Sequence, residues 1–208
     1  MPKRSKSSSR WLQEHAKDPY VRRARQEGWR SRAVFKLEQI QRAERFIRPG
    51  MLIIDLGAAP GGWSQFAARM LAGRGEVFAL DILPMDAVPG VTFVQGDFRE
   101  QGALDQLRAA LAGRKADLVM SDMAPNLSGI DAVDQPRAMH LAELALEFAD
   151  EVLKPGGDLL LKLFQGSGFQ ELVREIRRRF ATVKLRKPAA SRARSAEVYL
   201  LARGRKMV

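Results

Sequence analysis

The sequence predicts an α/β domain with a doubly wound, mostly parallel, Rossmann-like sheet of seven strands. Three observations support this prediction. From residue 51 onward, short apolar runs alternate with stretches of helical periodicity. A glycine-rich turn follows the first run directly, and an aspartate stands at the end of each of the first four runs. Ligands of doubly wound sheets lie beyond the carboxyl ends of the strands, where these aspartates are expected.

The expected elements follow from the apolar pattern. The expected strands are 51–56, 76–80, 91–95, 117–121, 158–164, 182–186 and 198–202. The expected helices are 31–46, 64–71, 103–111, 136–153 and 169–180. Only a loop separates the last two strands, which predicts an antiparallel hairpin at one edge of the sheet.

Local signals set the expected boundaries. Ser31 is the expected N-cap of the first helix. The segment 154–157, Lys-Pro-Gly-Gly, is expected to end the helix before it. The segment 127–134 reads equally well as a mobile lid and as a plain surface loop.

The length and composition predict one folded unit. With 208 residues, of which 46% are hydrophobic, the chain can bury one full core. Residues 31–208 are expected to form a single domain, and residues 1–30 a basic extension whose first ten residues are disordered. No stretch approaches the roughly 20 apolar residues of a membrane span. The segment 1–10 lacks the apolar segment of a secretory signal, and a cytoplasmic protein is the default expectation. The composition of this segment, rich in arginine and serine, leaves a mitochondrial presequence as the alternative.

The absence of cysteine narrows the chemistry. The chain has no cysteine, which excludes disulfides, thiolate metal sites and covalent cysteine catalysis, including methylation of pyrimidine carbon 5 through an adduct. The two histidines, His15 and His140, have no metal-like spacing and receive no role. We therefore expect no metal site. We also expect no membrane partner, since no apolar span is present, and a monomer.

The positive charge is concentrated in the two ends of the chain. Residues 1–50 carry a net charge of +9 and residues 174–208 carry +10, whereas residues 51–173 carry −8, within a total of +11. If the two ends meet in space, they form a positive surface suited to a polyphosphate backbone. This pattern favours RNA as a partner, although basic termini can also serve only solubility.

The turn after the first strand predicts a nucleotide-like cofactor. It reads Gly57-Ala-Ala-Pro-Gly61-Gly, and glycine lets the backbone approach a ligand closely. It lacks the second glycine of the dinucleotide fingerprint and the Gly-Lys-Ser/Thr of a P-loop. S-adenosylmethionine, which has an adenosine but no phosphate, fits such a turn. Asp55, Gly57, Gly61 and Trp63 are the expected cofactor residues here, although Trp63 is nearly as well explained as a core residue.

Three further aspartates are expected in the same crevice. Asp81 is placed to accept hydrogen bonds from the ribose hydroxyls of the cofactor. Asp97 is placed to accept from the adenine amino group, and Asp122 follows the fourth strand. Each aspartate alone could be an ordinary helix cap, but the set predicts cofactor binding.

Several motifs together resemble the FtsJ-type ribosomal RNA ribose methyltransferases. They are Asp55-Leu-Gly-Ala-Ala-Pro-Gly-Gly-Trp63, Ser121-Asp-Met-Ala-Pro-Asn126, Leu161-Lys-Leu-Phe-Gln-Gly166 and Ser191-Arg-Ala-Arg-Ser-Ala-Glu-Val-Tyr199. The resemblance extends over nearly the whole chain and is strongest to the bacterial members that act on large-subunit 23S rRNA. It implies the class I methyltransferase fold, S-adenosylmethionine as methyl donor and a uridine ribose in the aminoacyl-site loop of the large subunit, within a ribosomal particle, as acceptor.

The resemblance also implies a catalytic tetrad of Lys36, Asp122, Lys162 and Glu197. In the usual sheet order of this fold, the strands that carry Asp122, Lys162 and Glu197 are neighbours. Lys162 interrupts the apolar run 159–164, and a buried charge is costly unless it has partners or a task. It is the candidate proton acceptor, with Lys36 as its cationic neighbour. Lys162 could instead stay charged and stabilise the developing alkoxide.

Three other functions compete with ribose methylation. Methyltransferases that act on base nitrogens commonly stack the base on an aromatic residue, and the segment Asp122-Met-Ala-Pro125 has none. A non-catalytic RNA-binding or ribosome-assembly factor would not need an intact tetrad. A nicotinamide-dependent oxidoreductase is favoured by the fold alone.

Overall fold

The computed structural model describes residues 18–125, 128–192 and 195–207. The expected disordered arm, residues 1–10, lies outside the described residues. The helices are α2 (Pro19–Gln26), α3 (Val34–Glu44), α4 (Gly62–Leu71), α5 (Gln101–Leu111), α6 (Asp131–Val152) and α7 (Phe169–Arg179). The strands are β1 (Leu52–Leu56), β2 (Glu76–Asp81), β3 (Val91–Gln95), β4 (Ala116–Ser121), β5 (Leu153–Phe164), β6 (Phe180–Arg186) and β7 (Glu197–Arg205).

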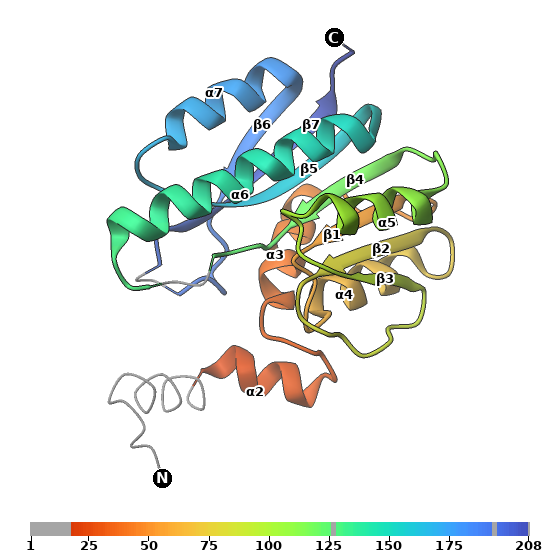
Figure 1. Ribbon diagram of the computed structural model, residues 1–208. Coiled ribbons are helices and arrows are strands. Elements are labelled where there is room, and N and C mark those ends of the chain that lie inside the picture. Colours follow the sequence, from red (N-terminus) through yellow and green to blue (C-terminus); the bar gives the residue numbers. More distant parts are fainter. Residues whose placement is uncertain (1–17, 126–127, 193–194, 208) are drawn as a thin grey trace.

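The strands form one seven-stranded sheet in the order β3-β2-β1-β4-β5-β7-β6 (Figure 1). Strands β1 to β5 are parallel to one another, whereas β7 is antiparallel to both β5 and β6. The predicted doubly wound sheet with an antiparallel edge is therefore confirmed, as is the adjacency of β4, β5 and β7.

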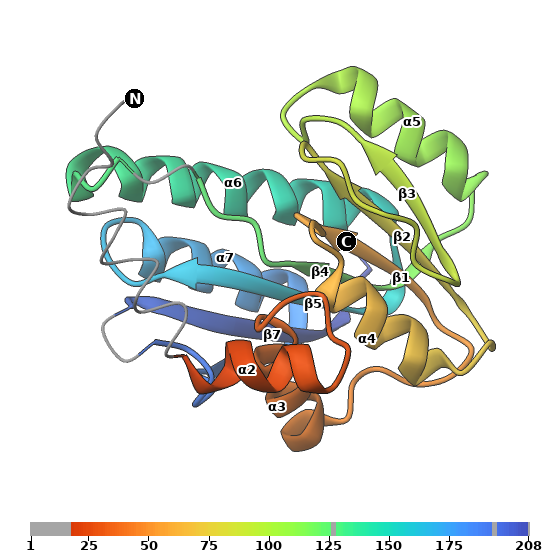
Figure 2. The same cartoon turned by 90° about the horizontal axis from the view of Figure 1, so that it is seen from below.

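Helices cover both faces of the sheet, as Figures 1 and 2 show. Helices α5, α6 and α7 pack with one face into one apolar core, and α2, α3 and α4 pack with the other face into a second. In β5, Leu159, Leu161 and Leu163 belong to the first core, and Leu160 belongs to the second. Because side chains alternate along a strand, Lys162 lies on the same face as Leu160, the face covered by α3.

Helix α2 is an element that the apolar pattern did not predict. Asp18 is its N-cap, with a carboxylate that accepts a hydrogen bond from the Tyr20 amide at 2.9 Å, and Pro19 is its first residue. Val21 and Ala24 are buried, so this part of the basic extension packs on the domain. The pair Asp18-Pro19 is a typical helix start and was the available signal.

Two predicted helix starts are wrong. Ser31 is not the N-cap of α3, because residues 31–33 form a turn and the helix begins at Val34. The Ser31 hydroxyl packs instead against Gly62, where a Cβ would lie 2.4 Å from it. Helix α6 begins at Asp131, five residues before the predicted Pro136, and continues through this proline.

The early start of α6 also corrects the loop predicted for residues 127–134. Residues 131–134 belong to the helix, and residues 126–127 lie outside the described part of the chain. The Asp134 carboxylate accepts hydrogen bonds from the Ser128 amide and hydroxyl, both at 2.8 Å, and from the Gly129 amide at 2.9 Å. These bonds fix the entry of the chain into α6. Across the described residues, no helix has both the length and the apolar character that a membrane span requires.

Candidate active site

The carboxyl ends of β4 and β5 and the start of β7 bring the predicted tetrad together. Asp122 follows β4 directly, and Lys162 lies near the end of β5. In the antiparallel pairing of β5 with β7, Lys162 is opposite Tyr199, and Phe164 is opposite Glu197. Helix α3 crosses this face of the sheet and contributes Lys36 from its first turn.

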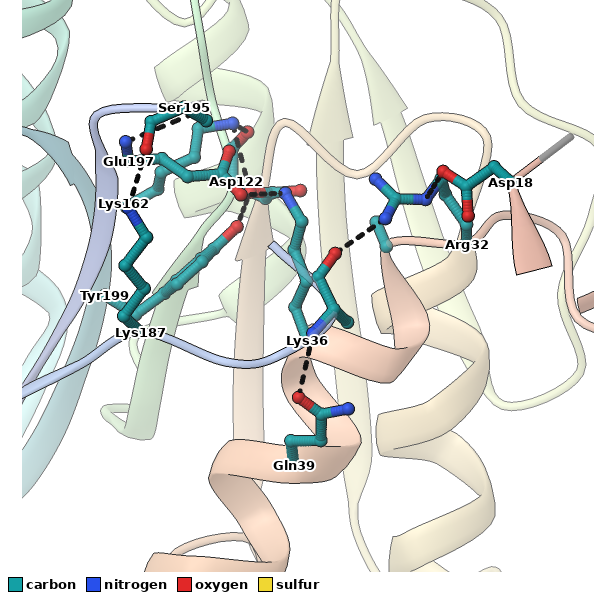
Figure 3. A network of polar contacts seen from close by, with 12 residues as sticks. Asp18, Arg32, Lys36, Gln39, Asp122, Lys162, Lys187, Ser195, Glu197 and Tyr199 are labelled. Atoms are coloured by element: carbon teal, nitrogen blue, oxygen red, sulfur yellow. Dashed lines mark hydrogen bonds and ion pairs between the residues drawn. The ribbon is translucent and has the colours of Figure 1, made fainter. Parts of the chain in front are cut away.

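Two buried ion pairs connect the four side chains (Figure 3). The Lys162 ammonium lies 3.0 Å from a carboxylate oxygen of Asp122 and also donates to the main-chain oxygen of Asp122. The Lys36 ammonium lies 2.7 Å from a carboxylate oxygen of Glu197. Only 8% of the Lys162 side chain and 9% of the Lys36 side chain are exposed. Each buried ammonium therefore has a carboxylate partner, as the cost of burying a charge requires.

Tyr199 is a site residue that the sequence did not reveal. Its hydroxyl donates to the same Asp122 oxygen that faces Lys162, at 2.8 Å. The Lys36 ammonium lies 5.6 Å from the centre of the Tyr199 ring, and the Trp63 ring packs against it at 5.8 Å. The available signal was its position two residues after Glu197 on one strand, because residues i and i+2 share a face.

The electrostatics of the site favour an ionised Asp122. Burial alone would raise the pKa of this carboxyl, but the ammonium groups of Lys162 and Lys36 and two hydrogen bonds outweigh it, and the pKa is lowered. The pKa of the Tyr199 hydroxyl is raised well above its usual value, by burial first and then by the carboxylates of Asp122 and Glu197. Tyr199 is therefore a neutral donor at physiological pH.

A cavity of about 730 Å³ opens next to the tetrad, beyond the carboxyl ends of β1, β2 and β4. Its wall includes four of the predicted cofactor residues, Gly57, Asp81, Asp97 and Asp122. Gly57 has a φ of +77° and passes so close to the neighbouring loop that a Cβ would lie 2.6 Å from the Met123 side chain. Glycine is thus required at this point of the cavity wall.

The aspartates of the cavity are held by their surroundings. The two carboxylate oxygens of Asp81 accept hydrogen bonds from the amides of Ala59 and Leu83, both at 2.8 Å. Asp97 pairs with the guanidinium of Arg99 at 2.6 Å, and this hydrogen-bonded pairing lowers the pKa of its carboxyl.

Three predicted cofactor residues lie outside the cavity wall. Asp55 is fully buried behind the glycine turn and accepts a hydrogen bond from the Ser64 hydroxyl at 2.6 Å. Burial raises the pKa of Asp55 to about 7, and the nearby carboxylates of Asp122 and Asp81 add to this effect. Gly61 is the N-cap of α4. The indole nitrogen of Trp63 donates to the main-chain oxygen of Ala33 at 2.9 Å, which ties α4 to the start of α3.

The cavity also has walls that the sequence did not single out. Apolar side chains of Ile82, Leu83 and Phe98 line it, and Ile82 and Leu83 are more than half exposed. Helix α6 contributes Arg137 and His140, one of the two histidines that received no role. Apolar side chains beside carboxylates suit a ligand that has both an aromatic ring and hydroxyl groups.

Arg30, in the linker between α2 and α3, fastens the cofactor turn to the loop after β2. Its guanidinium donates to the main-chain oxygens of Asp86 and Ala87, each at 2.6 Å, and of Pro60 at 3.4 Å. Its own amide donates to the side chain of Gln65 at 3.1 Å. One side chain thus joins three segments that are distant in sequence.

In the described ranges, no group of three or more His, Asp or Glu side chains is arranged to hold a metal ion.

Comparison with known proteins gives the family of the chain. The model of the FtsJ-like methyltransferase family matches residues 29–205. The chain belongs to this family. It is 60% identical over 207 residues to the ribosomal RNA large subunit methyltransferase E of Xanthomonas oryzae pv. oryzae, with 100% of this chain and 99% of the relative covered. The protein of the same name from Xanthomonas campestris pv. campestris is 59% identical, with 99% and 98% covered.

Solved structures agree with the fold. A ribosomal RNA methyltransferase structure from Plasmodium falciparum superposes with a TM-score of 0.77 at 25% identity, over 85% of this chain and 98% of the other. An rRNA methylase structure from Clostridium thermocellum superposes with a TM-score of 0.54 at 17% identity, over 81% and 96%, and supports the fold alone.

Proposed function

We propose that this protein transfers a methyl group from S-adenosylmethionine to the 2′-hydroxyl of a uridine ribose in the aminoacyl-site loop of 23S rRNA, within a large ribosomal particle. The observation that carries the proposal is the buried Lys162–Asp122 pair at the edge of the cavity, since Asp122 belongs to both. The names of the full-length relatives support large-subunit rRNA as the substrate. This substrate would place the protein in the cytoplasm.

The cavity fits the proposed methyl donor. Gly57 gives the backbone approach that an adenosine needs, and Asp81 and Asp97 offer carboxylate oxygens to hydroxyl and amino groups. Gly61 and Trp63 flank this wall at the start of α4, and Asp55 supports the turn from behind. When bound, S-adenosylmethionine supplies an electrophilic methyl group on a positively charged sulfur.

The residues of the tetrad then have separate tasks. As a neutral amine, Lys162 would take the proton of the ribose 2′-hydroxyl at its side-chain nitrogen, while the oxygen–methyl bond forms and the methyl–sulfur bond of the donor breaks. Asp122 fixes that nitrogen through two contacts, and Tyr199 fixes the Asp122 carboxylate. Lys36, held by Glu197, orients the hydroxyl from the α3 side. Much of the rate comes from this positioning, because the methyl group is already reactive.

Lys162 has an alternative role, in which its ammonium form stabilises the developing alkoxide. The two roles predict different pH profiles. A base gives a rate that rises with pH until Lys162 is neutral, whereas a cationic stabiliser gives a rate that falls once it loses its proton.

Substitution of Lys162 tests the proposal. Large subunits from cells that lack this protein are incubated with labelled S-adenosylmethionine and purified enzyme. We expect Lys162→Ala to lower the rate by about 100-fold or more, the usual contribution of a general base. Binding of S-adenosylmethionine, measured by calorimetry, should persist. Lys115→Ala is the matched control, because Lys115 is exposed and contacts only a main-chain oxygen in the described structure.

Full activity of Lys162→Ala would disprove the assigned role. If wild-type protein binds rRNA but transfers no methyl group, the chain is an RNA-binding factor and the proposed reaction is wrong.

A further inference from the structure

Five basic residues gather on the outer side of α3 and on the edge strand β6. They are Arg42, Arg45, Lys184, Arg186 and Lys187, and we call them the α3–β6 surface. Arg42, Arg45, Lys184 and Lys187 are exposed, and 39% of the Arg186 side chain is exposed. In the part of the chain that the structure describes, no carboxylate lies within ion-pair distance of Arg42, Arg45 or Lys187.

A buried carboxylate organises the centre of this surface. Glu44, at the end of α3, pairs with Lys184 at 2.8 Å and with the guanidinium of Arg186. Only 4% of the Glu44 side chain is exposed. The hydrogen bond from Lys184, despite the opposing effect of burial, keeps the pKa of Glu44 low. Glu44 therefore lies beneath the surface, and solvent meets the cationic side chains above it.

Two structural elements connect the α3–β6 surface to the tetrad: helix α3, and the segment that links Lys187 to Glu197. Helix α3 carries Lys36 in its first turn and Glu44 as its last residue, about 12 Å along the helix. On the other side, the Lys187 ammonium donates to the main-chain oxygen of Ser195, whose hydroxyl accepts from the Glu197 amide (Figure 3). The positive surface thus ends next to Glu197.

A second group of basic residues in the C-terminal part lies elsewhere. It comprises Arg177, Arg178 and Arg205, and we call it the distal group. Arg177 and Arg178 end α7, on the opposite face of the sheet, and Arg205 ends β7. At about 3.4 Å per residue, Arg205 lies about 27 Å along β7 from Glu197. Two cations of the distal group form ion pairs: Arg178 with Glu175, and Arg205 with Asp150.

We infer that the α3–β6 surface binds the phosphate backbone of the RNA next to the methylated nucleotide, and that the distal group does not. This inference rests on the proposed function, because it names where that RNA lies. When exposed lysine and arginine side chains without a carboxylate partner contact RNA phosphates, counterions are released from the RNA and the affinity of the protein for RNA increases. Side chains that already pair with a carboxylate contribute less. Because the surface ends next to Glu197, phosphate contacts there can also hold the ribose in register for the reaction.

Two variants that remove equal charge from different places test the inference. The first is Arg42→Gln with Lys187→Gln, on the α3–β6 surface. The second, the control, is Arg177→Gln with Arg178→Gln, at the distal end. Neither variant removes a partner of Glu44. The probe is a fluorescently labelled, unmodified 23S rRNA transcript, and its affinity is measured by anisotropy over a range of salt concentrations.

We expect the first variant to bind about tenfold more weakly near physiological salt. The slope of log affinity against log salt should fall by about 1.4 to 1.8, or 0.7 to 0.9 for each lost phosphate contact. The control should match wild type, and both should bind S-adenosylmethionine as wild type does, which verifies their folding.

Equal weakening of both variants would overturn the inference, because net charge alone would then explain it. Wild-type affinity of the first variant would overturn it as well. Methyl transfer by the wild-type enzyme is measured separately, so that a failure of the proposed function is distinguished from a failure of this surface.

Discussion

At the scale of single residues, the site depends on charged groups that are buried in pairs. Lys162 interrupts the apolar run 159–164 of β5, and its burial is tolerated because Asp122 contacts it through a side-chain and a main-chain oxygen. Tyr199 donates to the same carboxylate from the neighbouring strand. The arrangement leaves the Lys162 nitrogen little freedom, as an acid-base group requires.

Asp55 gives a prediction about pH and stability. Its pKa is raised to about 7 in the folded protein, mainly by burial, against about 4 in an unfolded chain. The stabilisation linked to its proton is complete below about pH 4 and is lost as pH rises through about 7. Between pH 5 and pH 8, the free energy of unfolding of wild type should therefore fall relative to that of Asp55→Asn.

Urea unfolding of both proteins at several pH values measures this difference. The Asn side chain can still accept from Ser64, so that the comparison isolates the charge. A difference that stays constant from pH 5 to pH 8 would show that Asp55 does not titrate in this range.

At the scale of elements, the strands and most helices could be predicted because short apolar runs alternate along the chain with stretches of helical periodicity. Helix boundaries were less predictable. Helix α6 continues through Pro136 because the later turns of the helix, from Ala142 to Val152, are packed in the apolar core. Ser31 packs on Gly62 and does not cap α3. These outcomes depend on tertiary contacts that a local pattern does not contain.

The candidate site could be predicted only in part. The family resemblance supplied Lys36, Asp122, Lys162 and Glu197, and the structure brings all four together. The hydrogen bond from Tyr199 to Asp122 and the Arg30 contacts were not predictable, because they depend on the register of β5 with β7 and on a linker that folds back over the cofactor turn.

The linker between α2 and α3 gives a prediction about cofactor affinity. Arg30→Ala removes the bonds that join Pro60 to Asp86 and Ala87, and the loop after β2 lines the cavity. We expect the dissociation constant for S-adenosylmethionine to rise about tenfold, the equivalent of one or two net hydrogen bonds. Arg30→Lys should not restore it, because one ammonium cannot replace the planar fork.

Calorimetric titration measures these affinities, with Arg74→Ala as the control on an exposed loop. Wild-type affinity in Arg30→Ala would mean that the loop after β2 keeps its position without the guanidinium.

At the scale of the whole molecule, the two basic ends of the chain meet only in part. Among the described residues, the end of α3 and the strand β6 share one positive surface, whereas α7 lies apart from it. Helices α2 and α3 lie on one face of the sheet and α7 on the other, with β6 and β7 at the edge between them (Figures 1 and 2). Among the described residues, the net charge of the two ends therefore overstates the positive surface at the tetrad. What faces the site is the smaller α3–β6 surface, and the acidic middle of the chain includes the aspartates of the cavity.

The central claim is that this enzyme methylates a ribose hydroxyl of large-subunit rRNA. Mass-spectrometric mapping of modified nucleotides in 23S rRNA tests it most directly, in cells that lack the protein and in cells complemented with wild type or Lys162→Ala. We predict that one 2′-O-methyluridine in the aminoacyl-site loop disappears and returns with wild type but not with Lys162→Ala. An unchanged methylation pattern, or the loss of a methyl group on a base instead of a ribose, would contradict the account.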